Sequence, residues 1–304
     1  MATAGYKDHK GDWMTGGDRL DSAFDSSLFA SSGREKLRRA LELAPVYYFR
    51  DLPRYVVSRR ELGLAPWDGR ALLNPLREFR RRVYAKLPLP PQYETALTQL
   101  RDSGARLAIP RLRLEGLLGV WWLTRTVSGD AIECGAYEGA TSLLLALLGR
   151  LNDLDQRIHV LDTFEGSPRP SRFDGGHREG EFRPPAGRPE ALARSARALG
   201  VADRLEIRVG LFSESFKTMT PLQPRFAFVH IDANLFGGTR DACLFTLPRI
   251  CPGGAVVFDD YNGVCDLGAR LAIDASLGRD GPAPRPLAWC SSYLRIPAAP
   301  AAGS

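Results

Sequence analysis

From residue 130 to residue 260, short apolar runs alternate with amphipathic or polar stretches. Five runs are typical of strands: DAIECG (130–135), RIHVLD (157–162), RLEIRVG (204–210), RFAFVHID (225–232) and AVVFDD (255–260). Strands that alternate with helices favour a parallel sheet with helices on both faces. We therefore expect an α/β fold, doubly wound around a mainly parallel sheet.

The rest of the chain suggests further parts. Residues 1–32 are rich in Gly, Ser and Asp, and residues 298–304 are rich in Ala, so we expect both ends to be mobile. Residues 33–110 contain helical patterns, such as REKLRRALELA, that prolines interrupt, and this predicts a helical accessory region. The main domain is expected over residues 111–297, beginning with a helix around RLEGLLGVWWLTRTV.

Composition narrows the class of protein. The chain has 304 residues, of which 44% are hydrophobic and 25% charged, as in ordinary globular proteins. Its longest apolar run, LLGVWWL, is far shorter than the ~20 residues that span a bilayer, and its N-terminus lacks an apolar signal segment. We expect a cytoplasmic protein with no membrane partner. Five widely spaced cysteines without a C-x-x-C pair indicate neither a disulfide framework nor a zinc site.

The net charge of +6 is concentrated near the N-terminus. Residues 31–86 contain fourteen Lys and Arg against six Asp and Glu. Such a run attracts nucleic acid in some proteins, but it is more often a solvated helical surface. Because no nucleic-acid-binding motif accompanies it, we expect no nucleic-acid partner.

Acidic residues mark the carboxyl ends of four of the five predicted strands. They are Glu133, Asp162, Asp232 and the pair Asp259 and Asp260. A doubly wound fold binds its ligands at this edge of the sheet. The strand ends are therefore the candidate functional site.

The loop ECGAYEGATS follows the first strand and opens a helix. Gly135 and Gly139 would allow a tight turn that brings backbone N–H groups to a ligand. The loop is not G-x-G-x-x-G, so a nucleoside without a pyrophosphate suits it better than a dinucleotide. Asp162 would then hold the ribose hydroxyls. S-adenosylmethionine is such a nucleoside, and Glu133 could face its cationic amino acid part.

Asp232, Asp259 and Asp260 follow the fourth and fifth predicted strands and should meet in a small volume. Like charges in a cleft require a cation or a proton between them. Oxygen ligands with open water positions suit Mg²⁺. His230, two residues before Asp232, is expected to be a strand residue below the site. The alternative is that these acids only cap the helices that follow.

A divalent ion beside a methyl donor would define a chemistry. It can hold two neighbouring substrate oxygens, lower the pKa of the one to be methylated and align it with the sulfonium methyl group.

Four motifs in this order resemble the macrocin/mycinamicin type of metal- and S-adenosylmethionine-dependent sugar O-methyltransferases: GDAIECGAYEGATS, VLDTFEGSP, HIDANLFGGTRDA and PGGAVVFDDY. The resemblance covers residues 110–295 and implies a Rossmann-like fold, a sugar or polyhydroxylated natural product as acceptor, and a place in antibiotic biosynthesis. It also implies which residues bind. The cofactor would be held by Glu133, Gly135, Tyr137, Gly139, Ser142, Asp162 and Asp232, and magnesium by Asp232, Asp259 and Asp260.

The sequence departs from this family after the first metal acid. Its usual H-x-D-x-D-x-Y run has Asn234 for the second acid and Phe236 for the Tyr. Related catechol-type enzymes have a Lys where Leu235 stands. An amide cannot act as a carboxylate base, so the general base is open. A catalytically impaired relative that serves as a binding or scaffolding subunit is the alternative function.

The remaining candidates lie in loops. Residues 169–190 are polar and Gly-rich, and form either a lid with His177 as a base or substrate contact, or a mobile surface loop. The catalytic candidates are therefore Asp232, Asn234 and His177. The accessory region is a candidate for the acceptor pocket or for the interface of a homo-oligomer.

Overall fold

The computed structural model describes residues 52–64, 87–175, 177–263, 266–278, 281–288 and 290–298. The expected N-terminal segment 1–32, the accessory helix over REKLRRALELA and the tail beyond residue 298 lie outside these residues.

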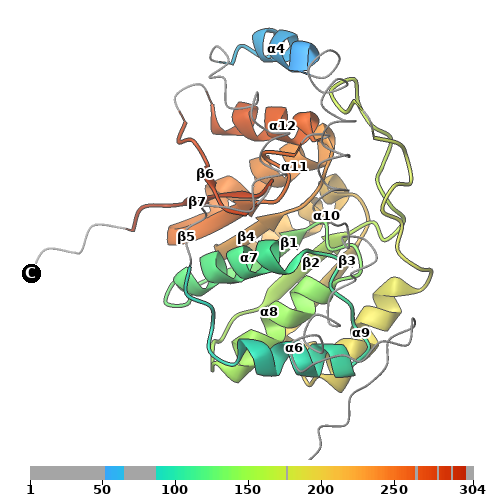
Figure 1. Ribbon diagram of the computed structural model, residues 1–304, viewed down its shortest axis with the longest axis vertical. Coiled ribbons are helices and arrows are strands. Elements are labelled where there is room, and N and C mark those ends of the chain that lie inside the picture. The colour runs from blue at the N-terminus through green and yellow to red at the C-terminus, as the bar shows by residue number, and fades with distance from the viewer. Residues whose placement is uncertain are drawn as a thin grey trace, which may run out of the picture.

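The centre of the molecule is a seven-stranded sheet of order β3-β2-β1-β4-β5-β7-β6 (Figure 1). Its strands are β1 (Asp130–Cys134), β2 (Ile158–Asp162), β3 (Leu205–Val209), β4 (Phe226–Ile231), β5 (Ile250–Phe258), β6 (Arg285–Pro286) and β7 (Ser292–Arg295). The first five pair in parallel, and β7 is antiparallel to both β5 and β6. The five predicted strands and the mainly parallel sheet are confirmed, whereas β6 and β7 were not predicted.

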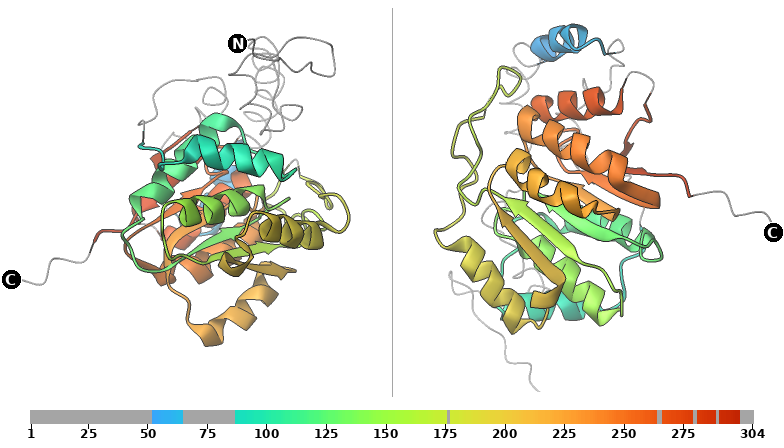
Figure 2. Two further views of the ribbon diagram at one scale, coloured as in Figure 1. Left: turned by 90° about the horizontal axis from the view of Figure 1, so that it is seen from below. Right: turned by 180° about the vertical axis from the view of Figure 1, so that it is seen from behind.

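Helices cover both faces of the sheet (Figure 2). Those on one face are α6 (Tyr93–Asp102), α7 (Arg111–Leu123), α8 (Ala140–Leu151) and α9 (Arg188–Ala198). Those on the other are α10 (Phe212–Met219), α11 (Phe236–Thr246) and α12 (Leu267–Leu277). Short 3₁₀ turns are η3 (Ala202–Arg204), η4 (Thr220–Leu222) and η5 (Leu247–Arg249). Among the described helices, none is long and apolar enough to cross a membrane.

Side chains at alternate strand positions pack into two separate hydrophobic cores, one on each face of the sheet. On β4, Phe228 packs in the cluster of α6 to α9, and its neighbour Val229 packs in the cluster of α10 to α12. On β5, Val257 packs in the cluster of α6 to α9, and Val256 packs in the cluster of α10 to α12. Burial on both faces explains why these strands read as continuous apolar runs.

The described parts of the predicted accessory region pack against the main domain. Helix α6 lies on α8 and contributes Leu97 and Leu100 to the same core as β1. Helix α4 (Leu52–Glu61) lies on α12, where Tyr55 is buried with Leu271. The domain boundaries stay a prediction, but α4 and α6 have different neighbours.

Candidate active site

The ends of β1, β4 and β5 are held side by side by backbone hydrogen bonds. The Asp232 N–H donates to the Cys134 carbonyl at 2.9 Å, and the Asp259 N–H donates to the Ile231 carbonyl at 2.9 Å. Gly135, with φ of 96°, lies so close that a Cβ would overlap the Asp232 carbonyl. The β1–β4 neighbourhood is the point where the strand order reverses, which is where doubly wound folds bind ligands.

Asp162 closes the loop that follows β1. Its carboxylate accepts the Tyr137 N–H at 2.8 Å and the Phe164 N–H at 2.7 Å. Burial raises the pKa of Asp162, and these two N–H bonds oppose the rise. The backbone N–H of Ala136 also faces this carboxylate and lowers its pKa. Gly139, at φ of 78°, is the residue before α8 and lies against Leu192, whose side chain would have to shift to admit a Cβ.

Glu133 faces the interior and is only 2% exposed. It accepts a hydrogen bond from the Ser142 hydroxyl, and its other oxygen lies 2.9 Å from His230 Nδ1. The cofactor roles of Glu133 and Ser142 stay predictions, since the structure gives these side chains each other as partners. His230 is a strand residue, as expected.

The β4 and β5 ends bring Asp232 and Asp260 together. Burial raises the pKa of Asp232 well above its usual range, and the nearby Asp260 carboxylate raises it further, while Arg113 opposes both. Asn234, in a left-handed conformation with φ of 55°, donates its N–H to Asp260 at 3.1 Å. Asn is among the residues that adopt this conformation most readily, so part of its role is to shape the turn.

Arg113, from the first turn of α7, supplies the positive charge in this cluster. Its guanidinium forms an ion pair with Asp259, and its Nη2 lies 3.9 Å from an Asp260 oxygen. Asp259 also accepts the Ser291 hydroxyl at 2.7 Å. The Arg113 side chain is 14% exposed, so this charge is largely withdrawn from solvent. Sequence patterns gave no signal for it, because Arg113 and Asp259 are 146 residues apart.

The donor set fits a divalent cation. One ligand atom from each of His230, Asp232 and Asp259 lies within 4.8 Å of the others. Cation ligands at about 2.0–2.2 Å from a shared ion lie at such mutual distances. Asp260 is beside this group through Asp232. We expected His230 below the site, and the structure places one of its ring nitrogens within 4.8 Å of carboxylate oxygens of Asp232 and Asp259.

The loop after β2 is held to the starts of helices α11 and α12 beside the site. Asp174 accepts the Phe236 N–H at 2.6 Å, at the start of α11. Phe173 packs on Phe236 with ring centroids 4.4 Å apart. Phe236 therefore contacts this loop with an apolar ring, at the position where the family's Tyr was expected.

His177 joins the same loop to the start of α12. Its Nδ1 lies 3.0 Å from Glu181 and its Nε2 lies 3.1 Å from Asp266. These carboxylates, Asp266 foremost, raise the pKa of His177 to about 9 against the opposing effect of burial. Both ring nitrogens thus face carboxylates, and the protonated form is favoured.

Helix α4 is linked to the loop after β5 through a polar cluster. Asp274 on α12 accepts the hydroxyls of Tyr55 at 3.1 Å and Tyr261 at 2.8 Å, and Tyr261 directly follows Asp260. The Arg270 guanidinium lies over both tyrosine rings. On its outer side, α4 and the loop after β2 enclose an open hollow of about 380 Å³, lined by Pro53, Val57, Ser58, Glu61 and Arg172.

The strand order and the ligand edge define the class. A 3-2-1-4-5-7-6 sheet with an antiparallel seventh strand is the Rossmann-like fold of class I methyltransferases, and solved structures of that class share it. The calicheamicin methyltransferase CalS11 aligns over 97% of this chain and 99% of its own, with TM-score 0.55 and 19% identity. The O-methyltransferase NovP aligns over 70% of this chain and 92% of its own, with TM-score 0.50 and 20% identity.

The chain belongs to the macrocin O-methyltransferase (TylF) family, whose profile matches residues 114–275. Mycinamicin III 3''-O-methyltransferase of Micromonospora griseorubida is 26% identical over 51% of this chain and 63% of its own length. A second relative is a tetracenomycin-C 4'-O-methyltransferase of Streptomyces olivaceus, whose name specifies a dimethoxyrhamnosyl derivative. It is 32% identical over 44% of this chain and 54% of its own length. The matches thus span between half and two thirds of these curated relatives.

Proposed function

We propose that this protein transfers a methyl group from S-adenosylmethionine to a hydroxyl of a sugar or polyhydroxylated natural product, with Mg²⁺ chelating adjacent acceptor oxygens. The supporting observation is that the loop after β1 and the carboxylates that follow β4 and β5 lie at one edge of the sheet. This is the edge at which the strand order reverses, between β1 and β4. A methyl donor and a chelated acceptor would therefore be neighbours.

The cofactor would lie along the loop after β1. In this proposal, the Asp162 carboxylate takes the ribose hydroxyls, and Gly135 lets the end of β1 lie against the Asp232 backbone, which positions the loop. The loop needs no pyrophosphate site. The left-handed Tyr137, with φ of 52°, keeps its N–H on Asp162 and so shapes the loop around that carboxylate.

The cation would be held by Asp232, Asp259 and Asp260. When bound, it supplies a Lewis acid that lowers the pKa of a chelated hydroxyl and orients it. Arg113 neutralises Asp259 and faces Asp260 when the cation is absent, which limits the repulsion between these carboxylates.

Among the catalytic candidates, we propose Asp232 as the group that accepts the substrate proton, since its carboxylate lies at the end of β4 beside the other acids. His177 is proposed as a positioning residue, because both its nitrogens are occupied by carboxylates. Asn234 is proposed to shape the turn that directs a backbone N–H to Asp260.

The acceptor class comes from the relatives. The curated relatives carry names of glycosylated antibiotics, among them mycinamicin, tetracenomycin and novobiocin derivatives. The acceptor pocket and the oligomeric state of the accessory region stay predictions.

The test combines cofactor binding with transfer. S-adenosylmethionine should raise the melting temperature, and a panel of glycosylated polyketides and aminocoumarins with labelled methyl donor should reveal a product. EDTA should abolish transfer without releasing the cofactor, and Mg²⁺ should restore it. Cofactor binding with no transfer to any acceptor would instead favour a binding or scaffolding subunit, whereas full turnover in EDTA would remove the metal from the mechanism.

A further inference from the structure

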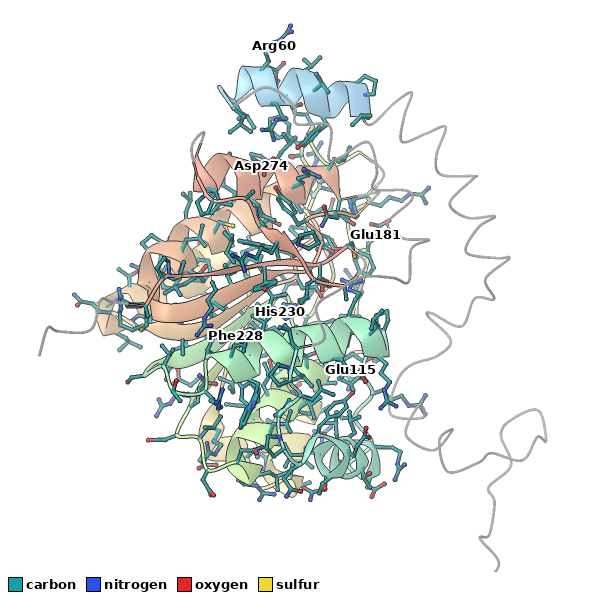
Figure 3. All side chains as sticks on the ribbon, turned by 60° about the vertical axis from the view of Figure 1, so that its left-hand side comes forward. Arg60, Glu115, Glu181, Phe228, His230 and Asp274 are labelled. Carbon is teal, nitrogen blue, oxygen red and sulfur yellow. The ribbon has the colours of Figure 1, made fainter. Side chains whose placement is uncertain are left out.

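His230 occupies an unusual place for a strand histidine. It lies on β4 opposite Glu133 of β1 and Val257 of β5, and it is 1% exposed. Figure 3 shows it in the interior of the molecule near Phe228, two residues earlier on the same strand. A buried imidazole must satisfy two ring nitrogens, and the structure provides for only one of them.

The first nitrogen is held by Glu133. His230 Nδ1 lies 2.9 Å from the Glu133 carboxylate, which can only accept, so Nδ1 carries the proton. Glu133 is itself held by the Ser142 hydroxyl. This chain of contacts fixes both the orientation and the tautomer of the ring, and in the neutral imidazole it leaves a lone pair on Nε2.

The second nitrogen has no hydrogen-bond partner. His230 Nε2 is buried and unsatisfied among the described residues. A ligand atom of His230 lies within 4.8 Å of those of Asp232 and Asp259, and Nδ1 is already engaged. Of the two ring nitrogens, Nε2 is the one whose lone pair is left for a cation. At protein metal centres, a histidine that binds the metal through one ring nitrogen commonly donates its other ring N–H to a carboxylate. His230 and Glu133 have this arrangement.

We propose that His230 is a metal ligand through Nε2, oriented by Glu133, and that the site is a mixed nitrogen and oxygen site for a transition-metal dication of the Mn²⁺ to Zn²⁺ series. This inference rests on the metal site of the proposed function and changes its chemistry. An imidazole adds affinity for transition metals that it does not add for Mg²⁺. Mg²⁺ then becomes a weaker occupant of the same carboxylates.

The same geometry explains two further features. Glu133 is buried and engaged, which suits a residue that acts on the cation through His230. Arg113 holds Asp259 in the structure described here, and its side chain would have to leave that carboxylate for a cation to bind there. A metal at Nε2 would thus replace a guanidinium on Asp259 and satisfy an unpaired nitrogen in one step.

The experiment is pulsed electron paramagnetic resonance of Mn²⁺ bound to the tag-free full chain. We expect modulation from one directly coordinated ¹⁴N, which should change to the ¹⁵N pattern when the protein is labelled with ¹⁵N-histidine. His230→Gln should abolish this signal and weaken Mn²⁺ binding about 10- to 100-fold, the cost typical of disturbed metal shells. Mg²⁺ binding should change less than about threefold, since Mg²⁺ has little preference for nitrogen.

His159→Gln is the matched control. His159 is also a buried strand histidine, with Nε2 2.8 Å from Asp130, but Asp130 starts β1 while the proposed site lies at its other end. Its variant should keep the nitrogen signal. If His230→Gln fails to fold, the wild-type spectrum and its isotope dependence still decide the question.

Different outcomes separate this inference from the proposed function. Wild-type Mn²⁺ that binds, is lost in Asp259→Asn and shows no coordinated nitrogen would leave the carboxylate site standing and overturn the role of His230. Wild-type protein that binds neither Mn²⁺ nor Mg²⁺ would overturn both.

Discussion

The two halves of the ligand edge neutralise their acids in different ways. On the β1–β2 side, Asp162 is stabilised by backbone N–H groups, among them those of Tyr137 and Phe164. On the β4–β5 side, Asp259 is paired with Arg113, and Asp232 shares its surroundings with Asp260. A single buried carboxylate can be stabilised by neutral donors, whereas a cluster needs positive charge. This difference is the reason that we propose a nucleoside for the first half and a cation for the second.

The largest effect should come from removing one acid in each half. Asp259→Asn is expected to lower methyl transfer at least about a hundredfold, since metal-assisted charge stabilisation contributes several kcal/mol. S-adenosylmethionine affinity, measured by calorimetry, should remain. Asp162→Asn should instead act on cofactor binding and weaken the affinity for S-adenosylmethionine about tenfold. Equal loss of cofactor binding in both variants would show that the two halves are not separate sites.

Arg113→Met tests the internal counter-charge. Breaking a buried ion pair from one side typically costs about 3–5 kcal/mol, because the remaining charge is left unpaired. We expect a clear fall in the free energy of unfolding in EDTA, and a larger recovery with Mn²⁺ than wild type shows.

Arg111→Met is the control on the same helix. Arg111 pairs with Glu94 and Glu115 at a more exposed position, so its loss should cost under about 1 kcal/mol. Equal destabilisation by the two variants would argue that Arg113 only packs, without neutralising the cluster.

His177 connects the two halves, since it joins the loop after β2 to α12 after β5. Its pKa is raised from 6.5 to about 9 by Asp266 and Glu181. A raised folded-state pKa stabilises the protein fully below pH 6.5, and this contribution is lost as the pH rises through about 9. Between pH 6 and pH 10, wild type should lose about 2–3 kcal/mol more than His177→Gln in urea unfolding. Parallel pH profiles would contradict the proposed connection.

Asn234 should have a small effect on stability. A left-handed backbone costs most residues about 1–2 kcal/mol and costs Gly almost nothing. Asn234→Ala should therefore destabilise by about 1 kcal/mol, and Asn234→Gly by less. If the residue only shapes the turn, Asn234→Gly will retain methyl transfer. Loss of transfer in a stable Asn234→Gly variant would give the amide a chemical role.

The sequence by itself determined the architecture and the neighbourhood of the site. Strands buried on both faces must be apolar throughout, so β2, β4 and the second half of β5 could be found from their runs alone, whereas β3 is partly exposed along its length. Acids that end such strands, such as Asp162 and Asp232, must lie at one edge because parallel strands end together. The short strands β6 and β7 escaped prediction because two to four residues carry no periodicity.

Only the tertiary structure decided which side chains meet. His230 was expected to lie below the site, and the structure adds that one of its ring nitrogens lies within 4.8 Å of carboxylate oxygens of Asp232 and Asp259. The partners of Asp259 and His177 are 146 and 89 residues away, at Arg113 and Asp266. Contacts of this kind leave no local pattern in a sequence, because the fold alone brings such distant positions together. The charge balance of the site, and with it the choice of cation, is therefore a property of the packed structure.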